Sequence, residues 1–186
     1  MNKAPLSTQT GKLFIVIRKN KEISIDKIKA YCEKFGKEYA FIVHKNDKDK
    51  DTGEIIPIHY HIVLNAIDKN KRLSTHLNDI AKFFDFDNLN GVEIDKYRSL
   101  ESALQYLLHK NDKDKTQHKF EEIVSNFNKD ELLNYITCDV STLTFDFVYS
   151  LCKSSNNIIE VIRGLGLGNF QRYRATIWDI WNELKK

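Results

Sequence analysis

The chain has 186 residues, of which 41% are hydrophobic and 30% charged, which is typical of a globular protein with one domain or one domain and a small appendage. No apolar run reaches the ~18 residues of a membrane span, and residues 1–11 lack the apolar core of a signal peptide. The net charge is +3, with the basic excess in residues 1–118, and the three cysteines form no C-x-x-C pair. We therefore expect a cytoplasmic protein with reduced thiols and no membrane partner.

The first half of the chain alternates between strand and helix patterns. Residues 12–18 form a predicted central strand, because apolar side chains occupy both of its faces. Ser24 is a candidate N-cap for a helix that ends at Gly36, and residues 38–44 are a second strand. A charged loop then leads into a third strand, residues 56–65, which we expect to pair with the second as an antiparallel hairpin.

A further helix, strand and helix complete this part of the chain. The helix starts at Ser74 or Thr75, the strand covers residues 91–95, and the second helix covers residues 99–109. The resulting order β-α-β-β-α-β-α predicts an α+β fold of the ferredoxin-like kind, which is an antiparallel sheet with helices on one side.

Strand signals stop at about residue 119, and helical patterns follow. We therefore predict two domains, residues 1–127 with the sheet and residues 128–186 with helices alone. The helical patterns cover residues 128–135, 144–153, 157–163 and the segment after Gly168.

The third predicted strand carries two histidines on one face. Because side chains alternate along a strand, His59 and His61 point to the same side, while the apolar residues beside them point to the other. Two imidazoles side by side on a rigid strand are suited to hold a metal ion. The alternative is a pair of histidines that face solvent or a polar neighbour.

Two more candidate ligands lie where the second strand ends. His44 is the last residue of that strand and Asp47 follows three residues later, so strand pairing brings both close to the two histidines. Three imidazoles and a carboxylate suit a divalent ion such as Mn²⁺. Asp49 and Asp51 compete with Asp47 for the carboxylate position, and all three aspartates alternatively belong to a solvated Lys-Asp loop.

The helix at residues 99–109 places a tyrosine at the edge of its apolar face. Tyr106 is either an ordinary boundary residue or a nucleophile, and a tyrosine hydroxyl needs assistance to attack at neutral pH. Lys110, one turn further along, is a candidate to stabilise the phenolate, and His109 is a second candidate. A charged run at residues 112–115 has no histidine strand beside it, and we interpret it as a solvated loop.

Three elements in this order resemble the HUH endonucleases, and most closely the Rep initiators of small Gram-positive rolling-circle plasmids. The resemblance spans residues 12–136, and its elements are His44-x-x-Asp47, His59-Tyr60-His61 and Tyr106-Leu107-Leu108-His109. It implies a ferredoxin-like sheet and an ion, Mn²⁺ or Mg²⁺, held by the three histidines at positions 44, 59 and 61 and an aspartate. This chain has His-Lys-Asn-Asp where those relatives have His-Asp-Lys-Asp, so Asp47 keeps the acidic position three after the histidine, and Asp49 stays open.

The activity implied by the resemblance is nicking and rejoining of one DNA strand at a plasmid double-strand origin. Tyr106 would attack the DNA backbone, form a 5′-phosphotyrosine and release a 3′-hydroxyl that primes rolling-circle replication, with Tyr97 as the rival nucleophile. The implied partners are origin DNA, single-stranded or in a hairpin at the nick and duplex nearby, together with the host helicase and polymerase. The alternatives are a conjugative relaxase or single-strand transposase on the same fold, and a non-catalytic DNA-binding regulator with a degenerate site.

The C-terminal helices have the pattern of an interaction module. Residues 137–186 contain no histidine, and they carry apolar stripes at helical spacing. Trp178 and Trp181 cannot both face one small core, because three helical residues leave them about 60° apart, and aromatic anchors are enriched at interfaces. We expect a homo-oligomerisation domain, and the resemblance implies ring assembly, with a hexamer as the first stoichiometry to test. The alternatives are helices that only cover the sheet, and a helix-turn-helix that places Arg163, Arg172 and Arg174 on DNA phosphates.

Overall fold

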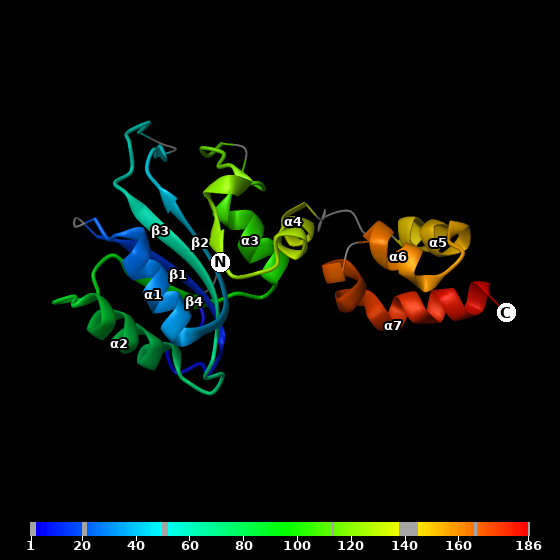
Figure 1. The fold of residues 1–186 in the computed structure, drawn as a ribbon, viewed down its shortest axis with the longest axis horizontal. Coiled ribbons are helices and arrows are strands. Elements are labelled where there is room, and N and C mark those ends of the chain that lie inside the picture. The colour runs from blue at the N-terminus through cyan, green and yellow to red at the C-terminus, as the bar shows by residue number, and fades with distance from the viewer. Residues whose placement is uncertain are drawn as a thin grey trace. The chain divides into compact units, whose positions relative to one another are not determined.

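The computed structural model describes residues 3–19, 22–49, 52–112, 114–137, 145–165 and 167–185. The chain divides into two compact units, Met1–Phe127 and Asn128–Lys186 (Figure 1). The first unit contains, in order, β1 (Lys12–Arg18), α1 (Ile25–Phe35), β2 (Gly36–His44), β3 (His59–Ala66), α2 (Leu73–Phe84), β4 (Val92–Lys96), α3 (Leu100–Leu107), the short 3₁₀ helix η1 (Phe120–Glu122) and β5 (Val124–Ser125).

The sheet has five strands in the order β4-β1-β3-β2-β5, and each pair of neighbours is antiparallel. The centre of the sheet is formed by β1 and β3, and both strands have buried residues on each of their two faces. The predicted β-α-β-β-α-β-α order is confirmed, and with it the α+β class. The edge strand β5 has only two residues, which is too short for a sequence pattern to reveal it.

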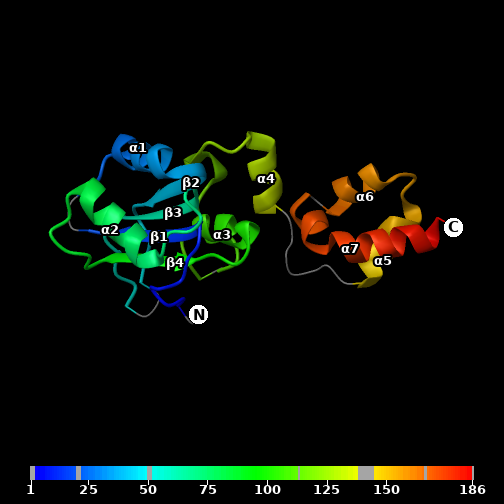
Figure 2. The ribbon, with the colours of Figure 1, turned by 90° about the horizontal axis from the view of Figure 1, so that it is seen from below.

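One face of the sheet is covered by α1 and α2 (Figures 1 and 2). Alternate residues of β1, β2 and β3 form a buried core with Tyr31 of α1 and Ile80 of α2. The predicted N-cap is present, since the Ser24 side chain accepts a hydrogen bond of 3.2 Å from the Lys27 backbone N–H. At Gly36 a Cβ atom would lie 2.3 Å from Leu64 Cδ1, so a residue without a side chain lets α1 pass directly into β2.

The opposite face of the sheet is contacted by α3. Its Tyr106 ring meets Phe14 of β1 edge-on, with 5.4 Å between centroids, and the Leu107 carbonyl lies 2.8 Å from His44 Nε2. The expected placement of helices on one side therefore describes α1 and α2, whereas α3 packs its apolar side on the face that carries the histidines. The helix also ends at Leu107, before its predicted end, because His109 adopts a left-handed backbone with φ 54°.

The described residues of the second unit form helices and no strand, as predicted from its sequence pattern. Its elements are α4 (Lys129–Thr137), α5 (Phe145–Ser154), α6 (Ile158–Leu165) and α7 (Leu167–Leu184). Cys152 of α5, Val161 of α6 and Ile177 of α7 lie in a small apolar core. Within the part of the chain that the structure describes, no helix combines the length and the apolar character needed to cross a membrane.

Candidate active site

Strands β2 and β3 bring three histidines together on the sheet face that α3 contacts. In the antiparallel register His44 lies opposite His59, and Ile42 lies opposite His61, so all three imidazoles project from the same face. The His44 ring centroid is 5.1 Å from that of His59 and 4.5 Å from that of His61. All three side chains are buried, so the hairpin creates an imidazole cluster inside the protein.

The loop after β2 turns Asp47 back onto this cluster. Asp47 as a whole is only 4% exposed, and its Oδ2 lies 3.0 Å from His44 Nδ1 and 3.4 Å from His59 Nε2. The loop is fixed by Ile56, whose N–H donates to the Asp47 carbonyl at 2.7 Å. Burial opposes ionisation of Asp47, yet the hydrogen bond with His118 and the nearby His44 hold the pKa of this carboxyl below its usual value.

Backbone carbonyls determine which nitrogen carries the proton in two of these rings. His44 Nε2 lies 2.8 Å from the Leu107 carbonyl oxygen, and His59 Nδ1 lies 3.0 Å from that of Pro57. Because a carbonyl oxygen only accepts, these nitrogens donate, and the other nitrogen of each neutral ring presents a lone pair. Both lone pairs face Asp47 Oδ2, so several acceptors converge on one place, an arrangement that a bound cation would complete.

His61 is buried without a hydrogen-bond partner for either ring nitrogen among the described residues. Burial holds the pKa of His61 well below its usual 6.5, and burial lowers the pKa of His44 to about 4. Both rings are therefore neutral at physiological pH, which is the form that binds metals. Since an unpartnered buried polar group costs stability, a cation beside His61 would remove that cost, and the residues present fit a divalent metal ion.

Two further histidines reach the cluster from the segment after α3. His109 donates through Nδ1 to the Thr116 carbonyl at 2.9 Å, and its Nε2 lies 3.7 Å from Asp47 Oδ2. His118 Nε2 lies 2.9 Å from Asp47 Oδ1, and its ring stacks on that of His44 with 4.0 Å between centroids. Two overlapping sets of residues could hold a metal ion, and within each set the donor atoms lie within 4.8 Å of one another. One set is His44, Asp47, His109 and His118, and the other is His44, His59 and His61.

The sequence predicts a role for His109 at the tyrosine and none for His118. The structure places the His109 ring 5.7 Å from that of Tyr106, and it brings both histidines beside Asp47. The left-handed turn at His109 folds the following segment back over the site. The only available signal was the position of His118 as the last histidine within the span of the family resemblance.

Tyr106 lies at the border of the histidine cluster. Its ring is held by Phe14, at 5.4 Å between centroids, and by His61, at 5.6 Å, while the residue as a whole is 40% exposed. Its hydroxyl accepts a hydrogen bond of 3.2 Å from Lys115 Nζ. A fixed ring with an accessible hydroxyl beside a cation suits a nucleophile.

The cation at Tyr106 comes from the run that the sequence analysis interpreted as a solvated loop. That interpretation is wrong for Lys115, which is partly buried and pairs with Asp112 at 3.4 Å. Burial opposes its charge, but the hydrogen bond to Tyr106 and the pair with Asp112 raise the pKa of Lys115 above its usual value. Lys110 is exposed, and its proposed role stays a prediction.

Tyr97, the alternative nucleophile, and Asp49, the alternative carboxylate ligand, both form hydrogen bonds outside the histidine cluster. Tyr97 is only 6% exposed, and its hydroxyl donates to Asn65 Oδ1. Asp49 uses its Oδ1 to accept the Thr52 N–H at 2.9 Å, which closes a turn at the protein surface. Asp51 lies outside the described residues.

Residues 9–130 match a family model described as plasmid replication protein, origin binding domain. The matched segment contains all the candidate ligands, Tyr106 and Lys115. No individual curated protein was matched by the sequence.

Proposed function

The chain belongs to the family of plasmid replication proteins that carry this origin-binding domain, and from this premise we propose that it nicks and rejoins one strand of origin DNA to initiate rolling-circle replication. The observation that carries the proposal is the placement of Tyr106. Its accessible hydroxyl lies beside Lys115 and at the border of a buried cluster of imidazoles around Asp47. A structural tyrosine would need neither the cation nor the cluster.

The chemistry of the chain's own residues is a phosphoryl transfer. The Tyr106 oxygen attacks the phosphorus of the scissile phosphodiester, and the new P–O bond forms as the bond to the DNA 3′-oxygen breaks. The phenol proton passes to solvent, and the departing 3′-oxygen takes up a proton to become the primer hydroxyl. Lys115 stabilises negative charge on the phenol oxygen, both before attack and when rejoining releases it. One P–O bond replaces another, so the 5′-phosphotyrosine retains the energy for rejoining.

We assign a divalent cation, Mn²⁺ or Mg²⁺, to His44, Asp47, His59 and His61. When bound, it would withdraw charge from a non-bridging oxygen of the scissile phosphate as a Lewis acid. The imidazole-rich donor set favours Mn²⁺, because Mg²⁺ prefers oxygen ligands. His109 and His118, which contact Asp47, would hold that carboxylate in its orientation.

The decisive experiment is to trap the covalent adduct. Labelled single-stranded oligonucleotides that span the origin are incubated with Mn²⁺ and the full chain, and the products are separated under denaturing conditions. Wild type should form a protein–DNA adduct, and Tyr106→Phe should form none. Tyr97→Phe is the matched control, because it also removes a tyrosine hydroxyl and should keep the adduct. An adduct in Tyr106→Phe would exclude this nucleophile, and no adduct in wild type would favour a non-catalytic DNA-binding regulator.

We also propose that the second unit assembles copies of the chain. Apolar side chains are exposed on α4, as Leu133, and on the three helices that follow, although the small core of the unit is formed. Trp181 packs against that core, whereas Trp178 is 38% exposed. The exposed set on α5, α6 and α7 is Phe145, Tyr149, Ile159, Tyr173 and Trp178.

A further inference from the structure

A cleft of about 610 Å³ opens beside Tyr106 on the sheet face that carries the histidines. Its floor lies over β1 and β4, and one wall is the part of α3 that bears Tyr106. The volume falls within the ~300–1,000 Å³ of sites that hold small ligands. Among the described residues, none of the four proposed metal ligands lines it, whereas Tyr106 and His109 do, so the cleft adjoins the proposed reaction centre.

Two residues on the cleft floor are direct neighbours across strands. Phe14 of β1 lies opposite Asp95 of β4 in the antiparallel register, so both side chains project from the same face. The ring of Phe14 is only partly buried. Asp95 Oδ1 accepts the backbone N–H groups of Ala4, at 3.1 Å, and Lys96, at 2.7 Å. Its Oδ2 accepts no hydrogen bond from the residues that the structure describes, so an aromatic surface and a free acceptor lie side by side.

The charged groups around the cleft differ in how far they are neutralised. Glu93 is bound by Lys3, at 2.7 Å, and also by Arg18, so its carboxylate is fully paired and Arg18 already has an anionic partner. Arg98 lines the cleft and is exposed, and within the described part of the chain it forms no ion pair. The cleft therefore offers one uncommitted guanidinium, the group best suited to bind a phosphate.

We propose that this cleft binds one unpaired nucleotide next to the cleaved phosphodiester, with its base stacked on Phe14, an exocyclic amino group of the base donating to Asp95, and a backbone phosphate on Arg98. The inference rests on the proposed function, which places the scissile phosphate beside Tyr106 at the border of the cleft. A base stacked within a duplex cannot enter such a cleft, so the strand must be single-stranded there. Cytosine, adenine and guanine carry an exocyclic amino group and thymine does not, so the cleft discriminates against thymine.

The test measures binding without the cleavage reaction. Fluorescence anisotropy of the full chain with short oligo(dC), oligo(dA) and oligo(dT) strands is recorded in EDTA, so that no adduct can form. Wild type should bind oligo(dC) and oligo(dA) more tightly than oligo(dT). Phe14→Leu should weaken binding to all three by about fivefold or more, because one base–aromatic stack is lost. Asp95→Asn should remove the preference against oligo(dT).

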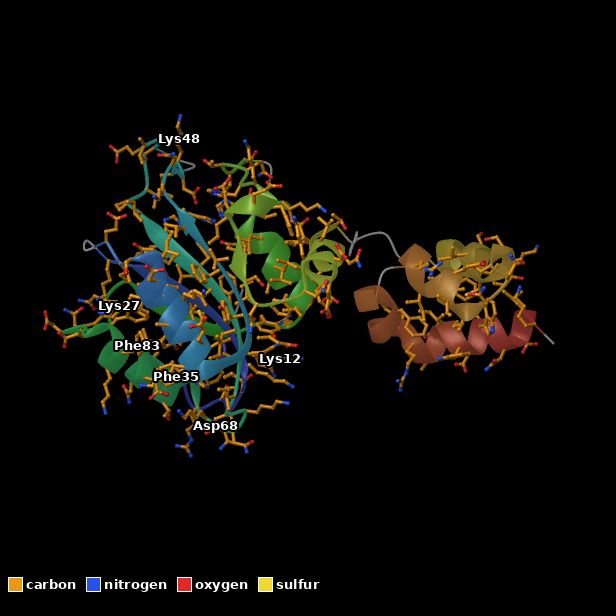
Figure 3. All side chains as sticks on the ribbon, in the orientation of Figure 1. Lys12, Lys27, Phe35, Lys48, Asp68 and Phe83 are labelled. Atoms are coloured by element: carbon orange, nitrogen blue, oxygen red, sulfur yellow. The ribbon has the colours of Figure 1, made fainter. Side chains whose placement is uncertain are left out.

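Matched controls separate the cleft from general effects on the fold. Phe83→Leu makes the same change beside Phe35, where the two rings meet at 6.0 Å between α1 and α2 (Figure 3), and it should leave the affinity unchanged. Arg98→Gln should reduce the slope of log affinity against log salt by about 0.7, the loss of one phosphate contact on a single strand. Arg72→Gln, an exposed arginine before α2, should not change that slope.

Equal binding by wild type and Phe14→Leu, or a similar loss in Phe83→Leu, would overturn the inference. If Phe14→Leu fails to fold, Asp95→Asn becomes the deciding variant, because the Asp95 side chain lies at the open cleft. An unaltered preference against oligo(dT) in Asp95→Asn would exclude the proposed contact between Asp95 and the base. Failure of the proposed function is distinguishable from failure of this inference. In that case wild type forms no adduct with Mn²⁺, while the affinity for single-stranded DNA in EDTA still depends on Phe14 and Asp95.

Discussion

Lys115 Nζ donates a hydrogen bond of 3.2 Å to the hydroxyl of Tyr106 and lies 4.9 Å from the centre of the same ring. One side chain thus contacts both the attacking oxygen and the π-face of the proposed nucleophile. As a cation it stabilises a phenolate more than the neutral phenol, so its effect grows as the hydroxyl ionises.

Lys115→Met should therefore slow formation of the adduct by about ten- to hundredfold and leave DNA binding nearly unchanged. The measurement is the single-turnover rate at saturating single-stranded DNA. Lys110→Met is the control, because it removes the same charge from the exposed lysine that the sequence analysis selected. A larger loss in Lys110→Met than in Lys115→Met would restore the original assignment and contradict the role inferred from the contact.

Metal binding should stabilise the metal-free chain against heat, because a ligand that binds only the folded state raises the free energy of unfolding. Mn²⁺ should raise the melting temperature of wild type, and this rise should be lost in His59→Ala and Asp47→Ala, since each leaves an incomplete set of ligands. Differential scanning calorimetry with and without EDTA measures the effect.

Two variants serve as controls for this measurement. Asp49→Ala removes a carboxylate that closes a surface turn, and His76→Gln removes a buried histidine that contacts the Thr10 carbonyl at 3.1 Å, outside the cluster. Both should keep the response to Mn²⁺. A response lost in Asp49→Ala but kept in Asp47→Ala would move the carboxylate ligand by two residues.

The metal-free chain should lose stability as the pH falls below about 6.5. Burial holds the pKa of His61 well below its usual value and lowers that of His44 to about 4, whereas in the unfolded chain both titrate near ~6.5. Below ~6.5 the unfolded chain therefore binds protons that the folded chain does not, and stability falls progressively toward pH 4. His44, with its pKa of about 4, accounts for about 2 kcal/mol of this loss at pH 5, and His61 adds to it in the same direction.

Thermal unfolding in EDTA at pH 7.5 and pH 5 tests this dependence. His61→Gln removes one of the groups with a depressed pKa, so the variant should lose less stability than wild type on acidification, whatever its stability at pH 7.5. An identical loss in both proteins would show that His61 is not held neutral in the folded chain.

The sheet and its helices were predictable because each rests on a local pattern. Apolar alternation indicates β1 and β3, and the capping serine at position 24 fixes the start of α1 within a residue. The position of α3 was not predictable in the same way. The apolar stripe of α3 shows that the helix packs on the sheet, but it does not show on which face. The face that α3 contacts depends on which face α1 and α2 already cover.

The candidate site also has a part that follows from local sequence patterns and a part that does not. Strand periodicity and hairpin pairing are enough to gather His44, His59 and His61, because both are properties of the backbone. Lys115 and His118 reach the site through an irregular turn after α3, where no periodicity relates sequence distance to position. The charged run at residues 112–115 has the same sequence pattern whether it is solvated or folds back onto the protein. The contact of Lys115 with Tyr106 therefore follows from the structure and not from the sequence.

The last prediction concerns the second unit, where exposed apolar side chains should mediate self-association. In α6 Ile159 is 56% exposed, and in α7 Trp178 is 38% exposed, so a charged residue at either position should not disturb the core of the unit. Burying these side chains between copies would favour assembly through the hydrophobic effect. Trp178→Arg and Ile159→Arg should therefore each reduce the mass of the full chain in light scattering, while circular dichroism shows that the helices stay folded.

Asp179→Arg, which introduces the same residue beside Trp178, is the control and should leave the mass unchanged. Nicking of short single-stranded DNA should persist in all three variants, because the proposed catalytic residues lie in the first unit. The helix-turn-helix alternative relies on Arg163 and Arg174, which are both exposed, and on Arg172, whose side chain lies outside the described residues. It predicts instead that arginine-to-glutamine changes at these positions abolish duplex binding without any change of mass. A wild-type chain that stays monomeric at micromolar concentration would refute the assembly proposal, because the exposed side chains would then have no partner copy to bury them.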